Sequence, residues 1–124
     1  MLERLLDSVI LIDHFNSVPQ ATKYLLALDP EKTAISVITY AEILTGLDDE
    51  GKQKARQLLF SFVMLEIDIV VAEKAAQMRR QHGWKLPEVF QAAIAIRHGI
   101  KLCTRNTKDF NPKKHHFVEI PYHY

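Results

Sequence analysis

Four carboxylates in this chain stand at or near points where a predicted strand gives way to a predicted helix. Asp7 follows the apolar run at the start of the chain, and Glu42 follows a similar boundary in SVITYAEILTG. Glu88 opens the helix in KLPEVFQAAIAI, and Asp109 closes the segment KLCTRNTKDF. Side chains that follow parallel strands converge outside their carboxyl ends, where α/β proteins form their sites. Crowded carboxylates raise one another's pKa, so a cluster of this kind indicates a bound cation.

Predicted strands and helices alternate along the whole sequence. The strands are expected at Glu3–Leu6, Thr33–Ser36, Glu66–Ile69, Lys101–Thr104 and Phe117–Ile120. The helices are expected at Ser8–Phe15, Pro19–Leu28, Thr39–Gly46, Lys52–Val63, Val71–His82 and from Pro87 until Gly99 stops the last one. Strands that alternate with helices of this length imply right-handed crossovers and a parallel sheet covered on both faces.

The composition is that of an ordinary globular domain. The chain has 124 residues, close to half of them apolar and a quarter charged, which fits a single domain over residues 1–124. Neither a signal peptide nor a run of about 20 apolar residues is evident, so we expect no membrane partner. Cys103 is the only cysteine, so no intramolecular disulfide is possible and the reducing cytoplasm is the expected compartment.

The formal net charge of +1 argues against a domain coated in lysine and arginine. A nucleic-acid enzyme of this charge would depend on local basic patches. Three groups are candidates, and each is equally a solvated helix or loop face: Lys52, Lys54 and Arg56; Arg79, Arg80 and Lys85; and Lys113, Lys114, His115 and His116. The six histidines show no spacing typical of metal ligands. Carboxylate ligands favour a hard ion, Mg²⁺ or Mn²⁺, over zinc.

Four short motifs follow one another from about Leu5 to Tyr122, nearly the whole chain. They comprise Asp7, Ser8, Val9, Ile10, Leu11, Ile12 and Asp13; Ser36, Thr39 and Glu42; Leu86, Pro87, Glu88, Ala92, Ala93 and Ala95; and Thr104, Arg105, Asn106, Asp109 and Phe110. In this order they resemble the motifs of the PIN-domain family of metal-dependent ribonucleases. The resemblance is greatest to the branch that contains the VapC toxins of prokaryotic toxin–antitoxin pairs.

The resemblance implies a PIN-like α/β fold, a three-layer sandwich with helices on both faces of a mostly parallel sheet. It also implies hydrolysis of RNA phosphodiester bonds by a toxin that uses Mg²⁺ or Mn²⁺. The ion would be held by four carboxylates and assisted by two polar side chains, which are Asp7, Glu42, Glu88, Asp109, Thr104 and Asn106.

Three partners follow from the same resemblance: an RNA substrate, a second copy of the chain in a homodimer, and a small antitoxin encoded alongside. The antitoxin would wrap around the toxin and obstruct its acidic pocket. The apolar segments Val18–Leu28 and Leu58–Met64 are either surfaces for this partner or parts of the core.

The chain departs from the family pattern at two positions. Val9 stands where the family usually has Asn, which removes a polar group beside the first acid. Glu88 stands where the family usually has Asp, which lengthens the side chain by one C–C bond, about 1.5 Å. Mg²⁺ requires oxygens at roughly 2.0–2.1 Å in near-octahedral geometry. The longer arm therefore calls for a bridging water or a retreat of the backbone.

Each acid also has a purely structural interpretation. Asp7 can cap a helix, Glu88 can interact with a helix dipole, and Asn106 with Asp109 can cap a short helix. Asp13 lies one and a half helical turns beyond Asp7, and we expect it to face solvent.

Two other functions fit parts of the pattern. A PIN-like module inactivated by Val9 and Glu88 would bind RNA or a protein without cleaving it. A receiver-like or phosphatase-like domain would be phosphorylated on an aspartate such as Asp7. The latter requires a second acid close to the first and a lysine after a later strand, and neither is clearly present.

Overall fold

All five strands belong to one sheet, and each strand is parallel to its neighbours. The computed structural model describes residues 1–124, with strand order β3-β2-β1-β4-β5. The strands are β1 (Arg4–Leu6), β2 (Thr33–Ser36), β3 (Val63–Leu65), β4 (Lys101–Cys103) and β5 (Val118–Glu119). The expected α/β architecture with a mostly parallel sheet is confirmed. The central position of β1 brings the carboxyl ends of β2 and β4 to either side of Asp7.

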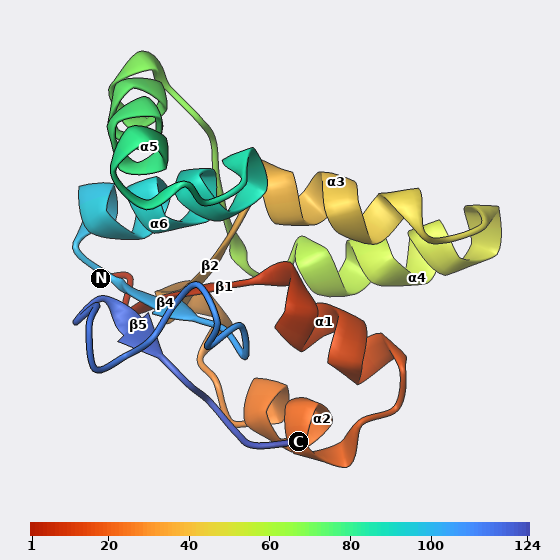
Figure 1. The fold of residues 1–124 in the computed structure, drawn as a ribbon. Coiled ribbons are helices and arrows are strands. Elements are labelled where there is room, and N and C mark those ends of the chain that lie inside the picture. The colour runs from red at the N-terminus through yellow and green to blue at the C-terminus, as the bar shows by residue number, and fades with distance from the viewer.

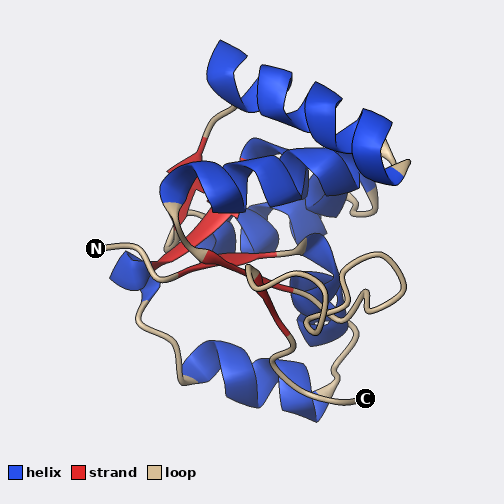
Figure 2. Cartoon of the chain, turned by 60° about the vertical axis from the view of Figure 1, so that its left-hand side comes forward, coloured by secondary structure: helices blue, strands red, loops and turns tan.

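Six α-helices cover the sheet (Figures 1 and 2). They are α1 (Ser8–Phe15), α2 (Pro19–Leu26), α3 (Val37–Thr45), α4 (Asp49–Leu59), α5 (Ile69–His82) and α6 (Leu86–His98). In Figure 1, α5 and α6 lie on one side of the sheet and α1 and α2 on the other. None of the helices is long and apolar enough to span a membrane.

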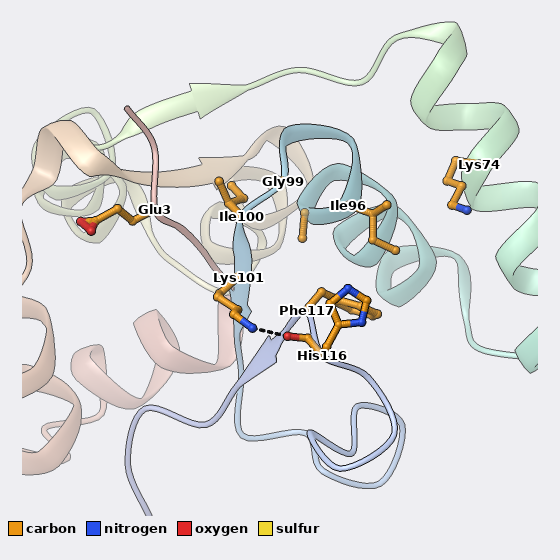
Figure 3. A pocket seen from close by; sticks show the side chains of 9 residues that line it. Glu3, Lys74, Ile96, Gly99, Ile100, Lys101, His116 and Phe117 are labelled. Atoms are coloured by element: carbon orange, nitrogen blue, oxygen red, sulfur yellow. Dashed lines mark hydrogen bonds between the residues drawn. The ribbon is translucent and has the colours of Figure 1, made fainter.

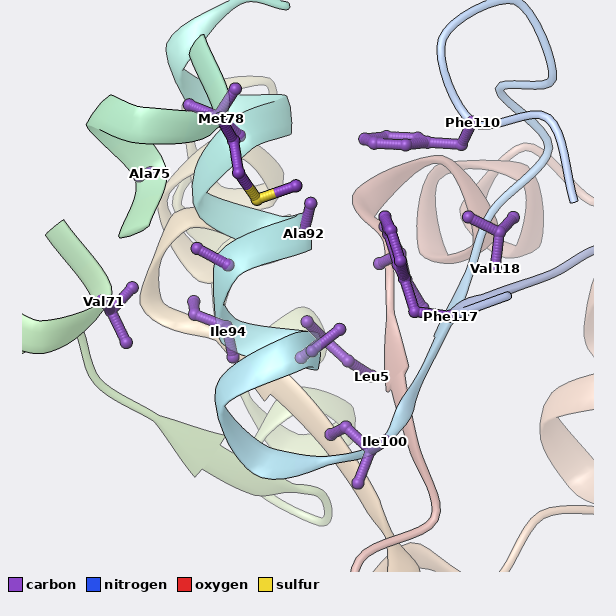
Figure 4. Packing of buried hydrophobic residues seen from close by; sticks show 14 of the residues in the cluster. Leu5, Val71, Ala75, Met78, Ala92, Ile94, Ile100, Phe110, Phe117 and Val118 are labelled. Carbon is purple, nitrogen blue, oxygen red and sulfur yellow. The ribbon is translucent and has the colours of Figure 1, made fainter. Parts of the chain in front are cut away.

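Alternate residues of the central strands point into two separate cores. Leu5 belongs to the cluster beneath α5 and α6, whereas its neighbour Leu6 belongs to the cluster formed with α1 to α4. Leu102 and Cys103 divide in the same way. Figure 4 shows the first cluster, with Val71 and Met78 of α5 on one side of it and Phe110 and Phe117 on the other. This alternation is the two-residue period of a strand covered on both faces.

The third strand lies earlier than the sequence predicts. The expected strand Glu66–Ile69 is wrong, because β3 is Val63–Leu65 and Ile69 already begins α5. Asp68 caps α5 by accepting a hydrogen bond from the amide of Val71 at 2.9 Å. The preceding helix α4 ends at Leu59, so Val63 is free to pair with Ala34 of β2. Because Asp68 caps α5, residues 66–68 form a connection between β3 and α5 and not a strand.

The boundaries of several helices are fixed by local capping. Ser36 accepts a hydrogen bond from the amide of Thr39 at 3.2 Å, so α3 begins two residues earlier than expected. At the other ends, Gly83 follows α5 and Gly99 follows α6 with φ angles of 74° and 64°. These left-handed conformations are readily adopted only by glycine, so they end the helices sharply.

Candidate functional site

Asp7 is held at the junction of β1 and α1 by three polar groups. Its Oδ1 accepts a hydrogen bond from the Ser8 amide at 2.8 Å, and its Oδ2 accepts one from the Thr104 hydroxyl at 2.7 Å. Burial raises the pKa of Asp7, although hydrogen bonds from Thr104, Ser8 and the Gln91 side chain oppose the rise. Asp7 therefore caps the helix as its structural interpretation requires, and the capping coexists with an electrostatically costly charge.

Gln91 is a site residue that the sequence patterns did not single out. It is 2% exposed and lies on the alanine-rich face of α6. Its Oε1 accepts a hydrogen bond from the Ser36 hydroxyl at 2.7 Å, and its Nε2 donates to the Thr39 hydroxyl at 2.7 Å. The Ser and Thr of the second motif thus hold Gln91 against Asp7. A lone amide among buried alanines was the signal that could have identified it.

Glu42 and Glu88 extend the negative charge away from Asp7. Burial raises the pKa of Glu42, and the charges of Asp7 and Glu88 raise it further, while a hydrogen bond from Ser8 lowers it. Glu88 has one oxygen, Oε2, that is buried and has no hydrogen-bond partner. The structure therefore brings Glu42 within electrostatic reach of both Asp7 and Glu88.

Asp109 is linked to the site through the loop after β4. Asn106 donates from Nδ2 to Asp109 Oδ2 at 3.2 Å, and its own amide donates to the Thr104 hydroxyl at 3.0 Å. Thr104 in turn donates to Asp7. A chain of hydrogen bonds thus joins the fourth acid to the first. Thr104 and Asn106, which we expected to assist the acids, both take part in this chain of hydrogen bonds.

Asp13 does not face solvent, so that expectation is wrong. Its side chain is 7% exposed and accepts two hydrogen bonds from Arg105, at 2.6 and 2.9 Å. The hydroxyl of Tyr122 donates a third at 2.7 Å. Burial raises the pKa of Asp13, but these bonds and the positive charge of Arg105 outweigh it and hold that pKa below its usual value. Helical spacing alone did not reveal this pair, because Arg105 is remote in sequence.

The carboxylates suit a hard cation by donor type and by charge. A positive ion would give the unpartnered oxygen of Glu88 a partner. It would also lower the raised pKa values of Asp7 and Glu42. In their present arrangement, no three His, Cys, Asp or Glu side chains are close enough to enclose one. Oxygen donors of this kind fit Mg²⁺ or Mn²⁺ chemically, and the outer acids would have to turn inward to complete a shell.

A hollow elsewhere on the molecule does not belong to the acidic site. It has a volume of about 440 Å³ and lies beside the amino ends of the strands, where Glu3 precedes β1 and Lys101 begins β4 (Figure 3). Lys101 donates a hydrogen bond across it to the carbonyl of His116. Asp7 stands at the opposite end of β1. The candidate site is therefore defined by its charges and not by the size of its cavity.

The two apolar segments considered for a partner each contribute some residues to the core. Val18, Ala21 and Leu25 are buried in the first, and Leu59 and Phe62 in the second. Two large side chains nevertheless remain outside, with Leu26 82% exposed and Phe60 63% exposed. Residues from both segments also line one hollow of about 260 Å³.

Comparisons with known proteins place this arrangement in a family. The PIN domain model matches residues 4–113. Ribonuclease VapC10 of Mycobacterium tuberculosis is 30% identical over 112 residues, which cover 86% of this chain and 84% of that protein. A toxin-antitoxin complex from Klebsiella pneumoniae contains a chain that is 36% identical, with a TM-score of 0.87 and coverage of 97% and 98%.

More distant structures share the same architecture. FitAcB from Neisseria gonorrhoeae is 25% identical with a TM-score of 0.79, and the two chains are covered by 98% and 99%. DNA-bound VapBC from Salmonella typhimurium, at 19% identity and a TM-score of 0.76, covers 89% of this chain and 91% of its own and supports the fold alone. The matched family model, the sequence identity and the shared fold agree: the chain belongs to the PIN-domain family.

Proposed function

We propose that the protein is a metal-dependent ribonuclease that hydrolyses RNA phosphodiester bonds and acts as the toxin of a toxin–antitoxin pair. The proposal rests above all on Glu42, whose pKa is raised by burial and by the charges of Asp7 and Glu88 beside the carboxyl end of β1. The relation to a ribonuclease over most of the chain supports the same chemistry. An RNA substrate would lie in the cytoplasm, which is the compartment that we propose.

Asp7, Glu42, Glu88 and Asp109 would hold Mg²⁺ or Mn²⁺. A divalent ion in such a site activates a water molecule and neutralises charge on the phosphoryl and leaving oxygens. The unpartnered oxygen of Glu88 supports its role as a ligand, because a buried acceptor without a partner is costly.

The polar residues orient the acids. Thr104 fixes one oxygen of Asp7 and the Ser8 amide fixes the other, so the carboxylate cannot rotate freely. Asn106 orients Asp109 in the same way. Such preorganisation matters because a misplacement of about 1 Å in a catalytic site costs on the order of 100-fold in rate.

An inactive PIN-like module is the second candidate, and the substitution at Glu88 favours it. Val9 argues less strongly for inactivity, since it is a residue of α1 that packs against the core cluster containing Leu6. Asp7 obtains its hydrogen bonds from Ser8, Thr104 and Gln91 and does not depend on a side chain at position 9. Conversion of Glu88 to Asp separates the two candidates. A large gain in cleavage would identify a weakened enzyme, and unchanged absence of cleavage would identify a binding module.

The Asp7→Asn variant tests the proposed hydrolysis directly. Asn caps helices as well as Asp does, so the fold should persist while the negative charge is lost. We expect Mn²⁺-dependent cleavage of RNA to fall at least about 100-fold, in line with the loss of an electrostatic contact in a catalytic site, with an unchanged far-UV circular dichroism spectrum. Asp48→Asn is the matched control, because Asp48 caps α4 through the amide of Gly51. Full cleavage by Asp7→Asn would exclude Asp7 as a required ligand.

We also propose an antitoxin partner and a homodimer. A solved relative with 36% sequence identity is a chain of a toxin-antitoxin complex. The hollow between α2 and the end of α4 has an exposed apolar rim that includes Leu26. An apolar segment of the antitoxin would fill this hollow. Calorimetric titration with the antitoxin encoded beside this gene should show binding that Leu26→Lys weakens at least about tenfold. Equal affinity of both proteins would remove this hollow from the interface, and sedimentation equilibrium would test the homodimer.

A further inference from the structure

Two short segments each carry several positive charges and contain no acidic residue. Residues 79–87 include Arg79, Arg80 and Lys85, and residues 110–118 include Lys113 and Lys114. All five side chains belong to exposed residues, and none of them forms an ion pair. The chain as a whole has a net charge of only +1. These two segments are therefore local concentrations of positive charge.

A cluster of aromatic rings brings the two segments to the same place. His82 stacks on Trp84, with ring centroids 4.1 Å apart and an interplanar angle of 11°. The ring of His115 lies edge-on to both, at 5.3 and 5.1 Å. Lys85 follows Trp84 and Lys114 precedes His115, so their backbones are held at one contact. Burial lowers the pKa of His115, and the nearby positive groups, including Lys114, lower it further.

The aromatic cluster also connects this region to the acidic site. Trp84 meets Phe110 edge to face, with centroids 4.9 Å apart. Phe110 immediately follows Asp109, and Trp84 lies four residues before Glu88. Two of the proposed ligands thus stand directly beside the basic segments. A polyanion that reaches the acids from this side meets positive charge immediately beforehand.

We propose that Lys85, Lys113 and Lys114 form a basic surface that binds the phosphates of single-stranded RNA next to the bond to be cleaved. The inference rests on the proposed function, because RNA is the polyanion that the acidic site would hydrolyse. A cluster of carboxylates repels the phosphates that flank the reacting one, so adjacent cations must hold the strand in place. Contacts to phosphate position a nucleic acid without reading its sequence.

The test uses a labelled single-stranded RNA and the non-cleaving Asp7→Asn protein. Binding is measured by fluorescence anisotropy over a series of salt concentrations. The slope of log affinity against log salt is negative, and each lost phosphate contact reduces its magnitude by about 0.7. The double variant Lys113→Gln with Lys114→Gln should therefore reduce the magnitude by about 1.4. The matched control is Lys52→Gln with Lys54→Gln on α4, which should leave the slope unchanged. Equal slopes for the two double variants would overturn the basic surface.

Cleavage assays separate this inference from the proposed function. In Mn²⁺, the Lys113→Gln/Lys114→Gln protein should show a raised KM and an unchanged kcat, because the lysines bind RNA but do not reach the reacting atoms. Cleavage with an unchanged KM would overturn the basic surface alone. Absence of cleavage by the wild-type protein, with the lysine-dependent salt slope retained, would overturn the hydrolase and leave the surface standing. Lys85→Gln provides an independent check at the other segment.

Discussion

Two aspartates six residues apart at the start and end of α1 have opposite electrostatic environments. Asp13 is paired with Arg105 and Tyr122, and its pKa is lowered. Asp7 is half-buried without a positive partner, burial raises its pKa, and its charge raises the pKa of Glu42. Neighbouring groups thus favour the ionised form of Asp13, whereas burial disfavours the ionised form of Asp7. The difference separates a structural ion pair from the proposed metal site.

The largest change in stability is expected when the compensated pair is broken. Asp13→Asn leaves the guanidinium of Arg105 without its charge partner in a partly buried place, since the side chain of Arg105 is 28% exposed. Removal of one member of a buried ion pair costs about 3 kcal/mol. Urea denaturation should show this loss. Glu50→Gln is the control, because the Glu50–Lys54 pair is 82% and 77% exposed and surface pairs of this kind contribute little.

The outcome of that experiment bears on how the loop after β4 is held. Arg105 lies between Thr104, which contacts Asp7, and Asn106, which contacts Asp109. A destabilised Asp13→Asn protein that still responds to metal would show that the pair supports the fold alone. If Asp13→Asn were as stable as Glu50→Gln, the contrast between the two aspartates would be lost.

The second prediction concerns the uncompensated acids. A ligand that binds only the native state stabilises it by about 2.7 kcal/mol at 100 times its Kd, and Mn²⁺ should do so here because it relieves repulsion around Asp7. Thermal denaturation in millimolar Mn²⁺ should therefore show a rise in Tm for the wild-type protein and for Asp13→Asn. The rise should be lost or much reduced in Asp7→Asn. A flat response of the wild-type protein would count against the carboxylate cluster as a metal site.

The sequence predicted the parts of this comparison that depend on local pattern. Alternating strands and helices placed Asp7 and Thr104 at strand ends, and the structure joins them by a hydrogen bond of 2.7 Å. Contacts between remote segments were not accessible in the same way. The pairing of Asp13 with Arg105 and the bridge from Gln91 to Ser36 span 92 and 55 residues. Their partners become neighbours only after the sheet has formed, so spacing along a single helix could not reveal them.

The pH dependence of stability provides the smallest and most selective test. In metal-free buffer, the raised pKa of Asp7 means that the native state takes up a proton before the unfolded chain does, so stability rises as pH falls towards the usual pKa of 3.8. Asp13 acts in the opposite sense, because its lowered pKa contributes stability that is present above 3.8 and lost as pH falls through its native value.

The two effects therefore occupy different pH windows, and variants can isolate each of them. Relative to the wild-type protein, Asp7→Asn should remove part of the gain above pH 3.8, and Asp13→Asn should remove part of the loss below it. Each difference is limited to one proton, about 1.4 kcal/mol per pH unit. Urea midpoints measured across this range would reveal both differences. If both variants changed the same window in the same direction, the two aspartates would share one environment, contrary to the geometry that separates them.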